Sequence, residues 1–160
     1  ELRVIELHPF AHWGEGRLLG EDGRLFVVQG AEAVPGLPHL NGPDDRVADV
    51  MDFYRLAQRD FAPFRLRVEN VELSERGSWS LVLSNGGTLV IGRDEPRQRL
   101  ARFIAVMPKL MANRTAGFVY ADLRYSNGFA VKWADAPAIP AQPAPHPATE
   151  SNSHAATGNA

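Results

Sequence analysis

Residues 119–133 constrain the fold of this chain more than any other stretch, because apolar and polar side chains alternate on both sides of a turn. The turn is Ser126-Asn127-Gly128, and residues of these types suit the backbone conformations of tight turns. The alternating apolar side chains are Val119, Ala121, Leu123, Tyr125, Phe129, Val131 and Trp133. Alternation with a period of two is typical of a half-buried β-strand. We therefore predict a β-hairpin that closes the folded part of the protein.

The length of this turn determines which side chains share a face of the hairpin. A two-residue loop would place apolar side chains of one strand opposite polar side chains of the other. A three-residue loop with Gly128 in the left-handed conformation keeps the large apolar side chains on one face. This register pairs Tyr125 with Phe129, Leu123 with Val131, and Asp122 with Lys132. The last pair brings opposite charges together, and we expect this register.

The final strand of the hairpin, Phe129–Trp133, is expected to lie at an edge of a sheet, because no foldable segment follows it in the sequence. An edge strand has unpaired backbone N–H and C=O groups that another chain can pair with. Addition of a strand by a partner is a common mode of peptide recognition. This edge is therefore a candidate binding site.

Residues 134–160 differ in composition from the rest of the chain. They contain five of the 12 prolines and nine alanines, but no aromatic residue, lysine or arginine. Such a segment buries too little apolar surface to offset the entropy lost on ordering, so we predict that it is disordered. The remaining positions, 1–133, contain 17 basic and 17 acidic residues. A neutral body argues against nucleic acid or an anionic membrane surface as the main partner.

Cysteine is absent, which excludes a disulfide framework, a thiolate nucleophile and a cysteine metal site. No stretch of the sequence approaches the roughly 20 apolar residues that a transmembrane helix needs. The sequence begins at Glu1, within a predicted strand, rather than at a methionine. We therefore expect a fragment whose targeting or anchoring segment lies upstream.

The order of predicted strands and helices indicates the fold class. Strands are predicted at 2–8, where Pro9 ends the strand, and at 17–19, 24–28, 65–73, 78–84 and 88–92, with a loop at 29–43. Asp44 or Asp45 is expected to cap a helix that runs to about Asp60, with an apolar face formed by Val47, Val50, Met51, Tyr54, Ala57 and Phe61. A second helix is expected from about Asp94, and Pro108 should kink or end it nearby. Mostly hairpin connections predict an α+β fold with a mostly antiparallel sheet and two helices.

No catalytic, cofactor-binding or metal-binding set is recognisable in the sequence. Gly14–Gly20 has one residue too many for a dinucleotide-binding loop, and no helix is predicted behind it. His8 and His12 have helical spacing, but Pro9 and the strand pattern prevent their alignment as metal ligands. The acidic residues that flank the helices are better explained as helix caps than as acid–base catalysts; they are Asp44, Asp45, Asp94 and Glu95. We predict no enzymatic activity and no cofactor or metal.

Two arginines are candidates for contact with a partner. Arg124 lies near the tip of the hairpin on its polar face, and Arg76 lies in a turn between two predicted strands. One interpretation is that both are solvated surface charges. The alternative is that they receive carboxylates of a partner, where an arginine fork adds orientation as well as energy. Local sequence leaves both interpretations open.

Several stretches resemble the FtsQ/DivIB family of bacterial cell-division proteins, in the order that the family has them. The most specific is Ala121-Asp-Leu-Arg-Tyr-Ser-Asn-Gly-Phe-Ala-Val-Lys-Trp133, which is similar to the C-terminal signature of the family. The others are Val4–Trp13, Gly36–Pro43, and Leu73–Trp79 leading to Arg99–Phe103. The resemblance covers nearly all of positions 1–133, whereas the tail is similar only in being variable and polar.

The resemblance implies a domain order and a role. Such proteins have a short cytoplasmic segment, one transmembrane helix, a POTRA domain and a β-domain, the last two in the periplasm. Residues 1–9 would be the last strand of a truncated POTRA domain, 10–133 the β-domain and 134–160 the disordered tail. The whole protein would be a single-pass type II protein of the inner membrane. It would be a non-enzymatic scaffold of the divisome that joins FtsB and FtsL and works with FtsK, FtsW and FtsI.

The resemblance also implies a partner-binding site. In such proteins the C-terminal tip of FtsB adds a strand beside the last strand of the β-domain. By motif match, Arg124 and Tyr125 would face acidic and aromatic groups of FtsB, and Arg76 would take a second carboxylate. The other expected contact residues are Ser126, Gly128, Phe129, Ala130, Val131, Lys132 and Trp133. The small residues at 128 and 130 would let a second backbone approach closely.

Two rival functions remain for comparison. POTRA modules also occur in outer-membrane assembly or secretion factors, and repeated modules or a following barrel would favour that class. A transmembrane helix directly upstream would favour the divisome class. An enzyme acting on peptidoglycan is the third class, and this chain offers no nucleophile, metal set or carboxylate pair for it.

Overall fold

The computed structural model describes residues 8–135. The strand predicted at 2–8 and assigned to a POTRA domain therefore lies outside the described residues, apart from His8. The same holds for the disorder predicted for the tail, apart from residues 134–135.

The strands of the described part form one nine-stranded sheet in the order β3-β2-β1-β4-β5-β6-β7-β8-β9. The strands are β1 (Pro9–Trp13), β2 (Arg17–Gly20), β3 (Leu25–Val27), β4 (His39–Asn41), β5 (Val68–Leu73), β6 (Trp79–Leu83), β7 (Thr88–Gly92), β8 (Phe118–Asp122) and β9 (Ala130–Trp133). Neighbouring strands are antiparallel except in the pairs β1–β4, β4–β5 and β7–β8, which are parallel. The predicted α+β fold with a mostly antiparallel sheet is confirmed.

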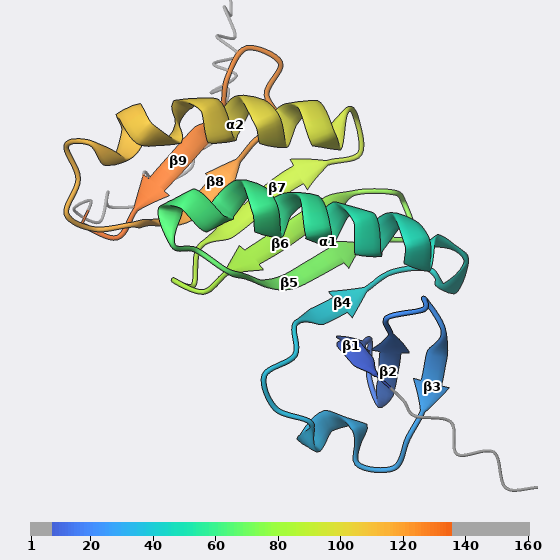
Figure 1. Ribbon diagram of the computed structural model, residues 1–160. Helices are drawn as coiled ribbons and strands as arrows, with labels where there is room; N and C mark the ends of the chain where they lie inside the picture. Colours follow the sequence, from blue (N-terminus) through green and yellow to red (C-terminus); the bar gives the residue numbers. More distant parts are fainter. Residues whose placement is uncertain (1–7, 136–160) are drawn as a thin grey trace, which may run out of the picture.

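Two α-helices, α1 (Val47–Phe61) and α2 (Pro96–Met111), lie side by side on one face of the sheet, over the part formed by β5–β9 (Figure 1). Short 3₁₀ helices occur at Ala31–Ala33, Asp44–Arg46 and Ala62–Phe64. The core lies between helices and sheet, and its largest fully buried side chains include Trp13, Phe53, Phe61, Phe103 and Phe118. The opposite face of β5–β9 carries polar and half-buried residues, as is common for an antiparallel sheet with one solvated face.

The helix faces agree with the predicted periodicity in most positions. In α1 the predicted residues Val47, Val50, Met51, Ala57 and Phe61 are buried. Phe53 is buried as well, because it packs on Trp79 with 4.4 Å between the ring centroids, whereas Tyr54 is only half-buried. Helix α2 ends at Met111, within one turn of Pro108, as its sequence predicts.

Two strands near the N-terminus were not predicted from the sequence pattern. One is β1, which begins at Pro9, and proline is tolerated at the first position of a strand. The segment predicted as a loop at 29–43 contains β4 (His39–Asn41), which pairs in parallel with both β1 and β5. This strand is only three residues long, and glycine and proline flank it. It forms because its two neighbours satisfy its backbone, and the sequence has no local signal for that.

The predicted helix caps are also wrong. Helix α1 is preceded by Arg46 without a side-chain cap, and α2 by Glu95 in the left-handed conformation, again without a side-chain cap. Asp44 instead accepts hydrogen bonds from both terminal nitrogens of Arg17, at 2.7 and 2.9 Å, and from the Trp13 indole at 3.1 Å. This carboxylate therefore connects the β1–β2 hairpin to the start of α1.

Asp44 gives a prediction about acid stability. The hydrogen bonds from Arg17, and then that from Trp13, hold the pKa of this carboxyl below its ordinary value. A lowered folded-state pKa stabilises the fold above the unfolded-state pKa of about 4, and this contribution is lost as pH falls through the folded-state value. We expect Asp44→Asn to lower the melting temperature at pH 7, and the gap to wild type to close below about pH 4. Thermal unfolding followed by circular dichroism measures this, and a gap independent of pH would contradict it.

The predicted register of the closing hairpin is wrong by two residues. Val131 lies opposite Ala121 rather than Leu123, and Asp122 lies opposite Ala130 rather than Lys132. Residues 123–129 form the connection, so a three-residue loop is excluded, and Gly128 has φ of 156°, far from the left-handed helical value. Two interactions explain the difference, one between near neighbours along the chain and one with a helix. Asp122, the last residue of β8, accepts a hydrogen bond from Arg124 two positions later. Phe129 packs against α2, and its ring centroid is 5.3 Å from that of Phe103.

Candidate partner-binding surface

Strand β9 is an edge strand of the sheet and has β8 as its single neighbour among residues 8–135 (Figure 1). The predicted edge position is therefore present in the described part of the chain. The direction of its backbone groups follows from β8. The Leu123 N–H donates to Val90 O of β7 at 2.8 Å, so the groups of Leu123 and Ala121 point toward β7. Tyr120 and Asp122, between them, point toward β9.

Alternation then assigns the backbone groups of β9 itself. Ala130 and Lys132 lie opposite Asp122 and Tyr120 and direct their N–H and C=O groups toward β8. The Ala134 N–H donates to Gly117 O at 3.1 Å, which fits the same alternation. Val131, opposite Ala121, therefore directs its N–H and C=O away from the sheet. These are the groups that an added strand would pair with.

Arg124 lies at the end of β8 and is held by a neighbouring carboxylate. Its Nε donates to Asp122 Oδ1 at 3.0 Å and its Nη2 to Asp122 Oδ2 at 2.7 Å. The Arg124 backbone N–H also donates to Asp122 Oδ1 at 3.0 Å. The side chain of Arg124 is 57% exposed and that of Asp122 only 8%. The hydrogen bonds from Arg124 hold the pKa of Asp122 below its ordinary value, so this carboxyl is ionised at neutral pH.

The Arg124 side chain lies against Gly92, the last residue of β7. A Cβ atom at Gly92 would be 3.0 Å from Arg124 Cγ and 2.8 Å from Arg99 Nη1. Gly92 also has φ of 83°, a conformation that side-chain-bearing residues rarely adopt. Arg99 is 14% exposed and donates from Nη1 to Ile91 O at 2.8 Å. Two arginines and one aspartate therefore gather around a glycine at this end of the sheet.

This close approach predicts a specific effect of Gly92→Ala. Gly86 is the matched control, because it has φ of 81° and nothing within 4 Å of an added Cβ. We expect Gly86→Ala to show only the cost of a positive φ, about 1 kcal/mol. Gly92→Ala should lose more stability, because Arg124 and Arg99 must also shift. Chemical denaturation of the two variants measures the difference, and equal losses would contradict the close approach.

Arg76 lies in the turn between β5 and β6 and is exposed. This turn lies at the same end of the strands as Arg124. Leu73 and Trp79 border the turn, and Trp79 pairs with Gly92 at the end of β7. Strand β7 is the single strand between β6 and β8. Within residues 8–135, no carboxylate lies within 4 Å of the Arg76 guanidinium. The fold thus places both sequence-predicted arginines at one end of the sheet without bringing them together.

The remaining predicted contact residues divide into exposed and buried groups. Tyr125, Ser126, Gly128, Ala130 and Lys132 are exposed. Phe129 and Val131 are half-buried. Trp133 is 9% exposed, and the Arg114 guanidinium lies over its ring at 4.5 Å from the centroid. The side chain of Trp133 therefore belongs to the core, and only its backbone is at the edge.

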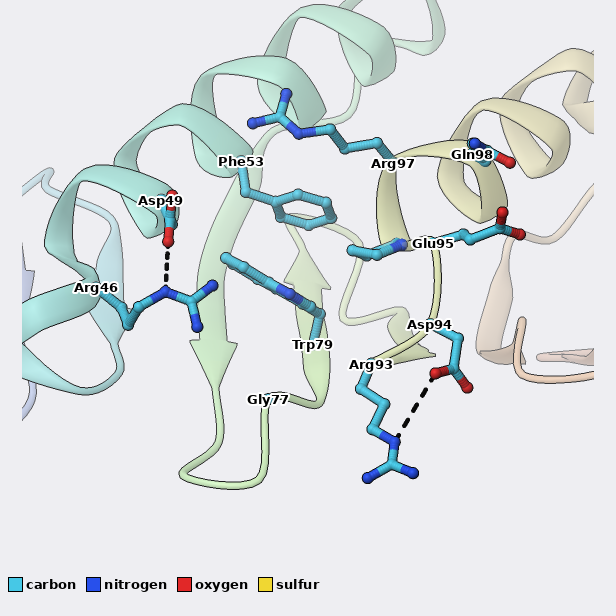
Figure 2. Close-up of a pocket in the computed structure, with 11 residues that line it drawn as sticks. Arg46, Asp49, Phe53, Gly77, Trp79, Arg93, Asp94, Glu95, Arg97 and Gln98 are labelled. Atoms are coloured by element: carbon cyan, nitrogen blue, oxygen red, sulfur yellow. Dashed lines mark hydrogen bonds and ion pairs between the residues drawn. The ribbon is translucent and has the colours of Figure 1, made fainter.

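Two cavities border this end of the sheet. One, of about 540 Å³, lies between α2 and the β8–β9 connection and is lined by residues including Arg102, Val106, Leu123, Gly128 and Phe129. The other, of about 580 Å³, lies between the N-terminal ends of α1 and α2, as Figure 2 shows. In Figure 2 the rings of Phe53 and Trp79 face each other at its centre. Two arginines that line this cavity form ion pairs, Arg46 with Asp49 and Arg93 with Asp94.

The described residues contain no group of three or more histidine, cysteine, aspartate or glutamate side chains placed to hold a metal ion. No helix of residues 8–135 is long and apolar enough to cross a membrane.

Sequence reasoning missed the supporting residues of this surface. Asp122 was expected to pair with Lys132 across the hairpin, whereas it holds Arg124 two positions along. The spacing was a usable signal, because residues i and i+2 of a strand share a face. Gly92 and Arg99 gave no comparable signal, since their approach to Arg124 depends on the pairing of β7 with β8.

Comparisons with known proteins add the relatives of this chain. A sequence model of the family described as "Cell division protein FtsQ/DivIB, C-terminal" matches residues 11–124. A protein from Xanthomonas campestris named "Cell division protein FtsQ" is 47% identical over 132 residues, which are 82% of this chain and 47% of that protein. Proteins of the same name from Aliivibrio fischeri and Coxiella burnetii are 37% and 32% identical, over 81% and 83% of this chain and 50% and 55% of their own lengths. The chain therefore spans about half the length of these relatives.

Proposed function

The chain belongs to the FtsQ/DivIB family of cell-division proteins, and on that premise we propose that it docks FtsB by strand addition at β9. The whole protein would then act as a non-enzymatic scaffold of the divisome that joins FtsB and FtsL. FtsK, FtsW and FtsI are further divisome proteins expected as partners. The domain would lie on the periplasmic side of the inner membrane, with a single transmembrane helix upstream in the full-length protein. Residues 1–9 would end a POTRA domain, and 10–133 would form the β-domain.

The observation that carries this proposal is the outward direction of the Val131 backbone groups at a sheet edge. Backbone pairing supplies affinity without requiring a particular side chain. Ala130 and Gly128 have small or no side chains, and both are exposed beside this edge, so a second backbone has room to approach. An edge strand left open in this way is otherwise a risk for aggregation, which a dedicated partner removes.

Side chains near β9 favour an acidic partner of fixed register. Arg124 and Arg76 are exposed at the end of the sheet where β9 begins. Carboxylates of FtsB that meet these two guanidinium groups would fix the position of the added strand along β9. The cavity of about 540 Å³ beside Gly128 and Phe129 offers a place for one apolar side chain of the same segment.

The rival assignment to outer-membrane assembly or secretion has no specific observation in its favour. The family match and the names of the relatives refer to cell division.

Titration of the purified domain with a synthetic peptide of the FtsB C-terminal region, from the same bacterium, tests the proposal. We expect saturable binding, with hydrogen-exchange protection gained at the backbone amides of β9. A peptide of identical composition in scrambled order is the control. Binding that leaves the exchange of β9 unchanged, or equal binding of both peptides, would contradict strand addition at this edge.

A further inference from the structure

We infer that Asp122 is the positioning residue for Arg124, holding one edge of its guanidinium so that the other edge faces a carboxylate of the partner. The inference rests on the proposed function and names the residue that orients its charged contact.

The geometry of the pair shows that Asp122 uses one edge of the Arg124 guanidinium and leaves the other edge free. Arg124 uses Nε and Nη2 to bind the two oxygens of Asp122, at 3.0 and 2.7 Å. A guanidinium has five N–H donors in a fixed plane, so three remain after these two bonds. They are the second N–H of Nη2 and the two N–H groups of Nη1, and one N–H from each of these nitrogens forms the adjacent edge of the fork. A second carboxylate can bind there in the same plane without displacing Asp122.

Asp122 is buried and Arg124 is exposed, as expected if Asp122 positions Arg124 and Arg124 contacts the partner. The Asp122 side chain is 8% exposed, and its Oδ1 also accepts the Arg124 backbone N–H at 3.0 Å. This carboxylate is fixed at the end of β8 by three hydrogen bonds from one residue. The Arg124 side chain is 57% exposed although it is held at its Nε and Nη2. The exposed part therefore belongs to a group whose orientation is already restricted.

The charges around Asp122 form two pairs. Arg99 is the second cation near this carboxylate, and its charge adds to the hydrogen bonds from Arg124 in keeping the pKa of Asp122 low. Arg99 is 14% exposed, donates to Ile91 O at 2.8 Å and lies 3.7 Å from Asp94, so it is already engaged within the domain. Arg124 is the exposed cation of the two, with a side chain 57% exposed. We expect loss of its orientation to outweigh the gain in net positive charge when Asp122 is neutralised.

Restriction of Arg124 before binding is the source of the expected effect. An unrestrained arginine loses rotamer freedom on binding, which weakens affinity about two- to tenfold for a side chain of this kind. Gly92 adds to the restriction, because the Arg124 side chain lies against its backbone.

A double-mutant cycle with Asp122→Asn and Arg124→Gln tests the inference, with the FtsB peptide as the probe. Asparagine keeps the Oδ1 acceptor for the Arg124 backbone N–H but loses the charge. We expect Asp122→Asn to weaken peptide binding about fivefold in the wild-type background, and less than about twofold when residue 124 is glutamine. Equal weakening in both backgrounds would assign Asp122 a merely structural role. Unchanged or tighter binding of the single variant would also overturn the inference.

Arg124→Lys provides a test that leaves Asp122 intact. Lysine has a single point charge and cannot bind Asp122 along one edge while presenting a planar fork to a partner. We expect this variant to bind the peptide as weakly as Arg124→Gln, and wild-type affinity would overturn the inference. Failure of the proposed function looks different, because the wild-type domain itself would then fail to bind the peptide.

Discussion

Charge reversal at Arg124 is expected to weaken binding of an FtsB peptide about thirtyfold. The substitution Arg124→Glu replaces a partner-facing cation by an anion and also repels Asp122, whose side chain is 8% exposed. The Arg124 side chain is 57% exposed in the free domain, so we expect an effect smaller than for a charge pair buried at the centre of an interface. Isothermal titration calorimetry of the variant domain with the peptide measures the effect.

Arg67→Glu is the matched control for this measurement. Arg67 precedes β5, at the other end of that strand from the Arg76 turn, and its side chain is 76% exposed. It changes the net charge of the domain by the same amount, and its effect on affinity should be small because distant exposed charges are screened by salt. A peptide in which an acidic residue is changed to lysine should recover part of the affinity for Arg124→Glu. Equal weakening by the two domain variants would remove Arg124 from the binding site.

Proline at position 131 is expected to weaken peptide binding at least about tenfold while the domain stays folded. The Val131 N–H points away from β8, so its loss removes no bond within the sheet. It does remove a donor that the added strand needs, and the proline ring occupies the space of that strand. Fluorescence anisotropy with a labelled peptide measures the affinity, and thermal unfolding measures the stability.

Two neighbouring substitutions separate the backbone effect from the side-chain effect. Val131→Ala shortens the same half-buried side chain but keeps the N–H, so it should bind the peptide much better than the proline variant. Lys132→Pro removes an N–H directed at Tyr120 of β8, so it should lower the melting temperature instead. If Val131→Pro binds like Val131→Ala, the added strand does not use this edge.

Local patterns were sufficient where one segment decides its own structure. The apolar spacing of residues 47–61 predicted the buried face of α1, and 88–92 was predicted as a strand with the bounds that β7 has. The position of β9 at an edge of the sheet formed by residues 8–135 also agrees with the sequence, because residues 134–160 show no strand or helix pattern. In each case the signal is the periodicity of apolar side chains, which depends only on neighbours along the chain.

Local patterns failed where a distant segment competes for the same groups. Asp44 had the sequence position of a helix cap, but the Arg17 and Trp13 side chains bind it across the fold. Strand β4 had no strand signal, yet β1 and β5 both pair with it. The hairpin register was decided in part by the packing of Phe129 on Phe103 of α2.

The sequence by itself determined the family, the fold class and the strand that offers its edge, since these depend on motifs and on periodicity within continuous segments. Only the tertiary structure decided that Val131 presents its backbone outward and that Gly92 supports Arg124. The physical reason is that hydrogen-bond direction and side-chain support arise between strands paired in space, and a one-residue change of register would alter all of them.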